Sequence, residues 1–170
     1  MNSEHRVERL GASHDRTTFD SGVLELDHYF HHQCGQDARR KVAAPFVMLN
    51  RQDAIVGYYT LSACGLHLAE FPEAIARKLP RYPVLPATLL GRLAIGRSYQ
   101  GRSLGRFLLM DALYRSWRNT SEVGSVGVAV DALDERASAF YLHYEFMQLR
   151  NSPNRLFRPM GTIEKAAQAR

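Results

Sequence analysis

The stretch from Leu89 to Arg106 reads LLGRLAIGRSYQGRSLGR, and it decides the fold of this chain. Its first seven residues form an apolar run typical of a buried strand, and the residues that follow it, 107–117, have the pattern of a helix. The turn between them is rich in glycine and arginine. A strand that feeds such a turn into a helix directs several backbone N–H groups at one point, which is an anion site. The arginines beside it, Arg97, Arg102 and Arg106, favour a phosphate group over a lone carboxylate.

The composition predicts one globular domain, residues 1–170, with a net charge of +5 that favours anionic partners. The polar N-terminus has no secretory signal, and no apolar run is long enough to span a membrane, so we expect a cytoplasmic protein with no membrane partner. Cys34 and Cys64 are too far apart in the sequence for a metal or redox pair. His28 and His32 have a spacing that suits zinc, but no further ligand accompanies them, so we expect no metal.

Periodicity and turn signals place further elements around the central stretch. The strand, helix and strand at its centre predict two parallel strands joined by a right-handed crossover, and the two strands before it predict an antiparallel hairpin. A mixed sheet with helices on both faces follows, in an α/β (α+β) fold. The expected strands are 7–10, 46–49, 55–63, 89–95, 125–130, 147–149 and 156–157; the expected helices are 20 to about 37–41, 72–79, 100–119 with its turn, 134–144 and 162–168.

The turn resembles the pyrophosphate loop of the GNAT superfamily of acyl-coenzyme A N-acetyltransferases, Arg/Gln-x-x-Gly-x-Gly/Ala, with Ser103 in place of its first glycine. The resemblance implies the GNAT fold, a mostly antiparallel sheet whose parallel βαβ core is splayed at the acyl-CoA site. It also implies acetyl-CoA as co-substrate, bound by the strand backbone and the loop. The implied contacts are Leu93, Ala94, Ile95, Arg97, Gln100, Gly101, Arg102, Ser103, Leu104, Gly105 and Arg106.

The serine at position 103 is the one departure from that loop pattern. Serine keeps its N–H, and its hydroxyl can meet a phosphate oxygen, but it takes a positive φ less easily than glycine does. We therefore expect a loss of cofactor affinity if this position needs a glycine conformation.

The helix around Tyr141 is similar to a second GNAT pattern, A-x-x-F-Y-x-x-x-G-F, with Glu145 where glycine is common. The resemblance makes Tyr141 the acid that protonates the departing thiolate of coenzyme A, a role that a nearby phenol can fill. Helical aromatic residues usually pack against a sheet, and this is our interpretation of Phe140 and Phe146. Tyr144 is the alternative proton donor.

Two further segments, 56–62 and 89–95, resemble the toxin branch of this superfamily. Members of that branch acetylate the α-amino group of aminoacyl-tRNA and stop translation. The resemblance therefore implies aminoacyl-tRNA as acceptor, a ribbon-helix-helix antitoxin as partner, and a homodimer.

The residue types agree with an α-amine acceptor. Neutralising a lysine amine near pH 7 costs roughly 4 to 5 kcal/mol and usually calls for a general base, whereas an α-amine costs only about 1 kcal/mol. No acidic residue lies between Val84 and Ser98, where many lysine acetyltransferases place a glutamate. The basic surplus suits a polyanionic acceptor stem. Candidate RNA contacts are Arg39, Arg40, Lys41, Arg77, Lys78, Arg81 and Arg92.

Two other functions stay open at this point. One is a housekeeping acetyltransferase that acts on protein N-termini or small amines. The other is a catalytically inactive adaptor of the same fold that binds RNA or protein through its basic surface, an interpretation favoured only by the departures at Ser103 and Glu145.

Overall fold

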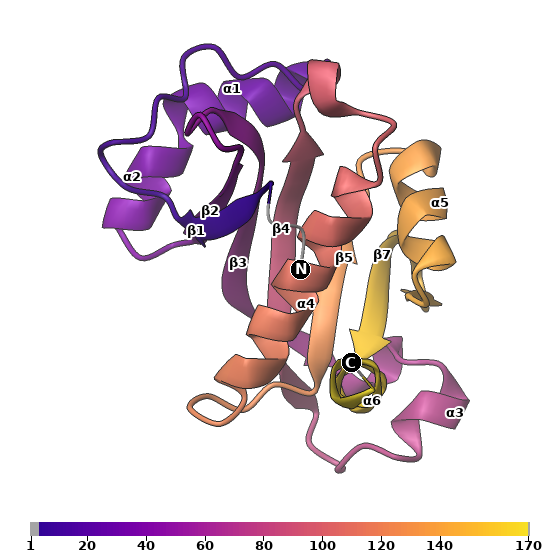
Figure 1. Ribbon diagram of the computed structural model, residues 1–170. Helices are drawn as coiled ribbons and strands as arrows, with labels where there is room; N and C mark the ends of the chain where they lie inside the picture. The colour runs from indigo at the N-terminus through magenta and orange to yellow at the C-terminus, as the bar shows by residue number, and fades with distance from the viewer. Residues whose placement is uncertain (1–3, 170) are drawn as a thin grey trace. The chain divides into compact units, whose positions relative to one another are not determined.

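The computed structural model describes residues 4–169, and seven strands within this range form one mixed sheet. The strand order is β1-β2-β3-β4-β5-β7-β6, and Figure 1 labels most of the elements. The strands are β1 (Arg6–Arg9), β2 (Ala44–Leu49), β3 (Ile55–His67), β4 (Val84–Ile95), β5 (Gly127–Asp131), β6 (Met147–Leu149) and β7 (Ser152–Pro159). The helices are α1 (Leu24–His32), α2 (Cys34–Arg39), α3 (Glu73–Ala76), α4 (Leu104–Asn119), α5 (Glu135–His143) and α6 (Met160–Gln168), with 3₁₀ turns at Leu68–Glu70 and Arg97–Tyr99.

The chain divides into two units, and the division falls within β3, β4 and α4. Unit 1 contains the residues up to Ser62 together with Gly91–Ala112, and unit 2 contains Ala63–Leu90 together with the residues from Leu113 onward. Each unit has a hydrophobic cluster of its own. The two halves of β3 and of β4 therefore belong to different cores.

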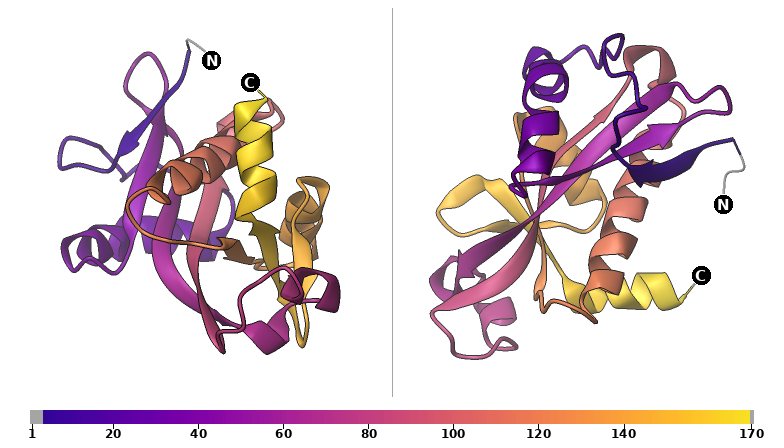
Figure 2. Two further views of the ribbon diagram at one scale, coloured as in Figure 1. Left: turned by 90° about the horizontal axis from the view of Figure 1, so that it is seen from below. Right: turned by 90° about the vertical axis from the view of Figure 1, so that its left-hand side faces the viewer.

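In unit 1, β2 and β3 form the predicted antiparallel hairpin, with Val47 opposite Tyr58. Tyr58 faces the first two helices, because its ring stacks on Phe30 of α1 with centroids 4.2 Å apart. The neighbouring Gly57 faces the first half of α4, where an added Cβ would lie 3.2 Å from Leu108. The left view of Figure 2 shows α1 and α2 on one side of these strands and this half of α4 on the other. Helices thus cover both faces, as the sequence predicts.

In unit 2, β4 and β5 run parallel, with Thr88 opposite Val128 and Leu90 opposite Val130. This pairing confirms the predicted strand–helix–strand unit. β7 then pairs antiparallel with both β5 and β6. Phe157 of β7 packs edge to face on Phe71, with ring centroids 5.0 Å apart, and side chains of α3 cover the same cluster.

The first helix differs from its prediction at both ends. It begins at Leu24 rather than at Asp20, because the Asp20 carboxylate accepts the N–H of Gly22 over 2.8 Å and Gly22 has a φ of +85°. These contacts make residues 20–22 a turn. The helix also ends at His32, and the expected continuation is a separate helix, α2.

β3 and β4 are longer than predicted, and α3 is shorter. β4 begins before Pro86, although a proline within a central strand cannot donate to the sheet. Its carbonyl oxygen accepts the N–H of Val126 over 2.9 Å, so Pro86 joins the sheet through its acceptor alone. Figure 1 shows β4 as one continuous strand.

Candidate active site

The loop between β4 and α4 presents a run of unused backbone donors. Among residues 4–169, none of the N–H groups from Gly101 to Arg106 donates to an acceptor on the protein, and the first bond of the helix is Phe107 N–H to Ser103 O, at 3.2 Å. The donors of the first helical turn ordinarily lack intrahelical partners. Six consecutive donors at the positive end of a sixteen-residue helix suit a diphosphate. We call residues 101–106 the cradle.

Ser103 adopts the left-handed conformation, which serine takes less easily than glycine. Its φ is +61°, and Gly101 nearby has a φ of +80°. A left-handed conformation costs a non-glycine residue roughly 1 to 2 kcal/mol. The cradle therefore has the conformation that a glycine at position 103 would give, at the expense of local backbone strain.

The three arginines of the motif lie in different surroundings. The Arg97 guanidinium lies 3.4 Å from the Asp20 carboxylate, so its charge is directed at residue 20. The Arg102 guanidinium lies 5.9 Å from the centre of the Tyr99 ring and is exposed, as is Arg106 in the first turn of α4. Arg102 and Arg106 therefore remain available to an anion at the cradle. The role of Arg97 as a cofactor contact stays a prediction.

The strand that leads into the cradle is packed closely against β3. An added Cβ at Gly57 would lie 2.7 Å from the carbonyl oxygen of Ala94, so only glycine allows this approach. The N–H of Gly96 donates to Val56 O over 2.7 Å, and Ile95 O accepts from the Gln100 side chain at 2.9 Å. The predicted pantetheine-binding residues Leu93, Ala94 and Ile95 thus belong to a firmly held segment.

Tyr141, in unit 2, lies in the last turn of α5, and the end of that helix fixes its position. The N–H of Phe146 donates to Tyr141 O at 3.1 Å, and that of Glu145 donates to Leu142 O at 3.2 Å. Glu145 has a φ of +70°. These features define a Schellman motif, in which glycine is the usual residue at the left-handed position. The motif explains why the related pattern has glycine where this chain has Glu145.

The Tyr141 side chain is buried between two aromatic neighbours. Its ring contacts Phe140 and Phe146 edge to face, with centroids 5.2 and 5.3 Å away. Burial raises the pKa of its phenol well above the usual value of 10. Because desolvation disfavours the phenolate, the residue keeps its proton throughout the physiological range. Such a group can act as a general acid toward a leaving thiolate.

Arg158 of β7 supports the same end of α5. Its side chain is 3% exposed, and it donates to Tyr144 O at 3.3 Å and to the Glu145 carboxylate at 3.1 Å. Burial lowers its pKa and the charge of Glu145 opposes that change. Arg158 therefore ties β7 to the residues that follow Tyr141.

The candidate RNA contacts fall into three groups. Residues 39–41 end α2 and are exposed, and so are residues 77, 78 and 81 around the end of α3. Arg77 donates to the Glu73 carboxylate over 2.8 Å, which compensates part of its charge. Arg92 is different, because its guanidinium lies 3.5 Å from the centre of the Tyr29 ring and is partly buried. Six of the seven cations are thus exposed, while Arg92 belongs to the face beneath α1.

Sequence reasoning missed two sets of residues near these sites. The polar turn Asp20–Ser21 accepts hydrogen bonds from Arg97 and Gln100, in the loop between β4 and α4, although its sequence predicts a helix start. Arg158 was not singled out at all, since a lone arginine in a strand gives no signal of the carbonyl that it will meet. The rule that αL positions favour glycine could have connected the departures at Ser103 and Glu145 with helix ends.

The comparisons with known proteins point to one group. The chain is 36% identical over 138 residues to the tRNA-acetylating toxin of Mycobacterium tuberculosis (strain ATCC 25618 / H37Rv), which covers 81% of each sequence. No protein-family model matches the sequence.

Two solved structures of the toxin AtaT are similar along nearly the whole chain. One is AtaT complexed with acetyl-methionyl-tRNAfMet, at a TM-score of 0.89 and 30% identity, covering 96% of this chain and 99% of that one. The other is a tyrosine-to-phenylalanine mutant of AtaT bound to acetyl-CoA and the C-terminus of the antitoxin AtaR. It has a TM-score of 0.82 and 27% identity, covering 96% and 98%.

Proposed function

Because the chain belongs to the GNAT family of tRNA-acetylating toxins, we propose that it transfers acetyl from acetyl-CoA to the α-amino group of an aminoacyl-tRNA and so blocks translation. The observation that carries this proposal is the cradle, whose six N–H groups have no acceptor among residues 4–169 and suit the diphosphate of coenzyme A. The chemistry that acetyl-CoA supplies is an activated acyl group with a thiolate leaving group.

In the proposed reaction the neutral amine attacks the thioester carbonyl carbon, so that a C–N bond forms and the C–S bond breaks. Tyr141 protonates the departing sulfur, and the proton that the amine loses returns to the phenolate through solvent. The raised pKa of Tyr141 supports this role, because the phenol is protonated at the start of each cycle. Desolvation disfavours the departing thiolate as it disfavours the phenolate, so burial raises the basicity of the sulfur together with the pKa of the acid.

The acceptor follows from what β4 lacks. No acidic residue lies between Val84 and Ser98 to deprotonate a lysine, whereas an α-amine needs only about 1 kcal/mol to become neutral near pH 7. The exposed cations of α2 and of the α3 region, residues 39–41, 77, 78 and 81, are the proposed contacts to RNA phosphates. Arg92 differs from these residues because its guanidinium stacks on the Tyr29 ring. This contact favours a role in packing at the surface below α1.

We further propose a cytoplasmic homodimer that is neutralised by a ribbon-helix-helix antitoxin. The AtaT complex with AtaR supports an antitoxin partner for a protein of this kind. None of the helices between residues 4 and 169 has the length and hydrophobicity of a membrane span. Sedimentation of the purified chain, alone and with the product of a neighbouring reading frame, tests the oligomer and the partner.

The experiment that tests the function offers the purified protein three acceptors with acetyl-CoA: charged tRNA, the same tRNA after deacylation, and a peptide with a free N-terminus. We expect acetylation of charged tRNA alone. Acetylation of the peptide instead would identify a housekeeping enzyme. Absence of acetyl-CoA binding in a calorimeter would identify an inactive adaptor.

A further inference from the structure

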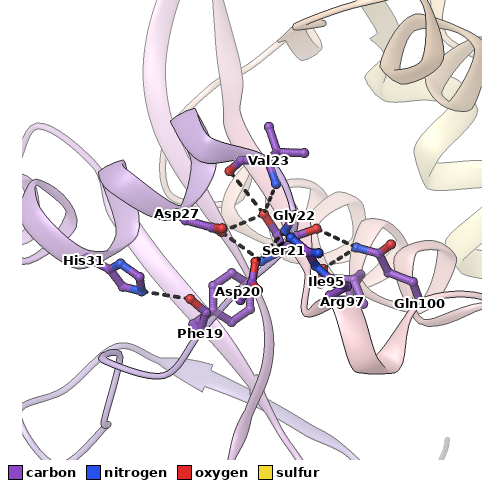
Figure 3. Close-up of polar contacts among 10 residues, drawn as sticks. All are labelled: Phe19, Asp20, Ser21, Gly22, Val23, Asp27, His31, Ile95, Arg97 and Gln100. Atoms are coloured by element: carbon purple, nitrogen blue, oxygen red, sulfur yellow. Dashed lines mark hydrogen bonds and ion pairs between the residues drawn. The ribbon is translucent and has the colours of Figure 1, made fainter.

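Both N–H groups of the Gln100 side-chain amide are used within the protein. Its Nε2 donates to Ser21 O at 2.8 Å and to Ile95 O at 2.9 Å (Figure 3). Gln100 is the residue immediately before the cradle. The family pattern suggests a cofactor contact at this position, but the amide N–H groups are directed at two backbone carbonyls, one on β4 and one on the segment before α1.

Arg97 makes a second connection between the same two segments. Its N–H donates to Asp20 O over 2.7 Å, and its guanidinium lies 3.4 Å from the Asp20 carboxylate. The guanidinium also covers Gly22, where an added Cβ would lie 3.3 Å from Nε. Residues 20–22 are therefore held against the loop between β4 and α4 by one backbone hydrogen bond, one hydrogen bond from a side-chain amide and one ion pair.

The held segment is in turn tied to α1. The Asp27 carboxylate accepts the N–H of Ser21 at 2.9 Å and its hydroxyl at 2.6 Å, and His31 Nε2 donates to Phe19 O at 2.9 Å. Figure 3 shows these contacts as a continuous chain from α1 to Gln100. Asp20, Ser21, Arg97 and Gln100 form what we call the clasp.

We propose that the clasp couples the cradle to α1, so that binding of a diphosphate at residues 101–106 orders residues 19–27. Gln100 is then a positioning residue and not a cofactor ligand. The inference rests on the proposed function for the identity of the ligand. Its physical basis is that a loop that is fixed by its ligand holds Gln100 in place, and Gln100 holds Ser21. Coupling of this kind is reciprocal, so disrupting the clasp lowers the affinity for the ligand as well.

The test is hydrogen exchange of the full chain with and without coenzyme A, in wild type and in three variants. Gln100→Leu removes both donors, Gln100→Arg restores donors of similar reach, and Gln52→Leu is a control at an exposed glutamine outside the clasp. In wild type and in Gln52→Leu we expect coenzyme A to slow exchange in residues 101–107 and also in residues 19–27. In Gln100→Leu, coenzyme A should slow exchange only in residues 101–107. In Gln100→Arg it should again slow exchange in residues 19–27.

Calorimetry gives the second readout. Gln100→Leu should lower the affinity for coenzyme A about tenfold, the factor expected when the coupling loses about one net hydrogen bond. Gln100→Arg should recover most of this affinity. Slowing confined to residues 101–107 in the wild type, or unchanged slowing of residues 19–27 in Gln100→Leu, would overturn the clasp while leaving the transferase intact. Coenzyme A that slows exchange nowhere would overturn the proposed function and the clasp with it.

Discussion

The N–H of Phe146 donates to the carbonyl oxygen of Tyr141 over 3.1 Å, and the two rings meet edge to face with centroids 5.3 Å apart. A hydrogen bond and an apolar contact between these two positions are the two parts of a Schellman helix end. The candidate proton donor is therefore positioned by the way its own helix ends. Desolvation alone raises the pKa of its phenol, so no hydrogen bond within residues 4–169 contributes to that shift.

Replacing Tyr141 by phenylalanine should remove the acid and little else. The ring contacts and the backbone bonds do not involve the hydroxyl, so we expect the unfolding free energy to change by less than about 1 kcal/mol. Turnover of charged tRNA should fall by roughly a hundredfold or more. Steady-state kinetics together with thermal unfolding check this. Tyr144→Phe is the matched control, and a larger loss in that variant would transfer the role to Tyr144.

Glycine at position 103 should stabilise the chain. Ser103 has a φ of +61°, and glycine adopts this conformation without the steric cost, so Ser103→Gly should add about 0.5 to 1 kcal/mol of unfolding free energy. Coenzyme A affinity should stay the same or rise, because the cradle already has the required shape. Calorimetry and thermal unfolding measure both quantities. A marked loss of affinity would show that the serine hydroxyl binds the phosphate.

Glu145→Gly relieves the same kind of strain at the end of α5, where the φ is +70°. The variant also removes the carboxylate that pairs with the buried Arg158, but the Glu145 side chain is 75% exposed and solvent screens its charge, so we expect this loss to be smaller than the strain that is relieved. We expect a net stabilisation of about 0.5 kcal/mol in urea unfolding. A net loss would mean that the Arg158 ion pair outweighs the backbone strain.

Arg158→Met should destabilise the chain, in contrast to Glu145→Gly. It leaves the Tyr144 carbonyl oxygen without its donor in a partly buried place, which costs about 1 kcal/mol. Because this carbonyl belongs to the cap that holds Tyr141, turnover should fall more than the KM for acetyl-CoA rises. Equal effects of Arg158→Met in the wild-type and Tyr141→Phe backgrounds would contradict this link.

The pH dependence of transfer should follow the acceptor and not the acid. The rate should rise as the α-amine loses its proton, with an apparent pKa of about 8, and then stay level to about pH 10. Burial raises the pKa of Tyr141 in the folded protein, so its contribution to stability is complete below about pH 10 and is lost as the pH rises further. A fall in rate between about pH 8 and 9 would exclude a phenol with this pKa as the acid.

The sequence predicted those elements whose signals are local. The glycine-rich turn before α4, the helix expected from residue 134 (where the Asp134 carboxylate accepts from Ala137 N–H at 2.8 Å) and the antiparallel hairpin of β2 and β3 all follow from short patterns. The family pattern around Tyr141 also predicted a helix that ends at the right place. In these cases propensity and packing agree.

The rest depends on contacts between distant segments. Asp20 and Ser21 resemble a helix cap in sequence, yet their backbone carbonyls accept from Arg97 and Gln100, about 77 to 79 positions away. The position of Arg158 beneath Tyr144 likewise depends on how β7 meets α5. A polar residue that bonds to a backbone carbonyl leaves no pattern in the sequence, because any segment supplies such an acceptor.

The most direct test of the central claim is a crystal structure of this chain with acetyl-CoA. We expect the diphosphate to accept hydrogen bonds from the backbone N–H groups of residues 101–106 and the thioester sulfur to lie within hydrogen-bonding reach of the Tyr141 hydroxyl. A diphosphate held elsewhere, or a sulfur far from that phenol, would contradict it.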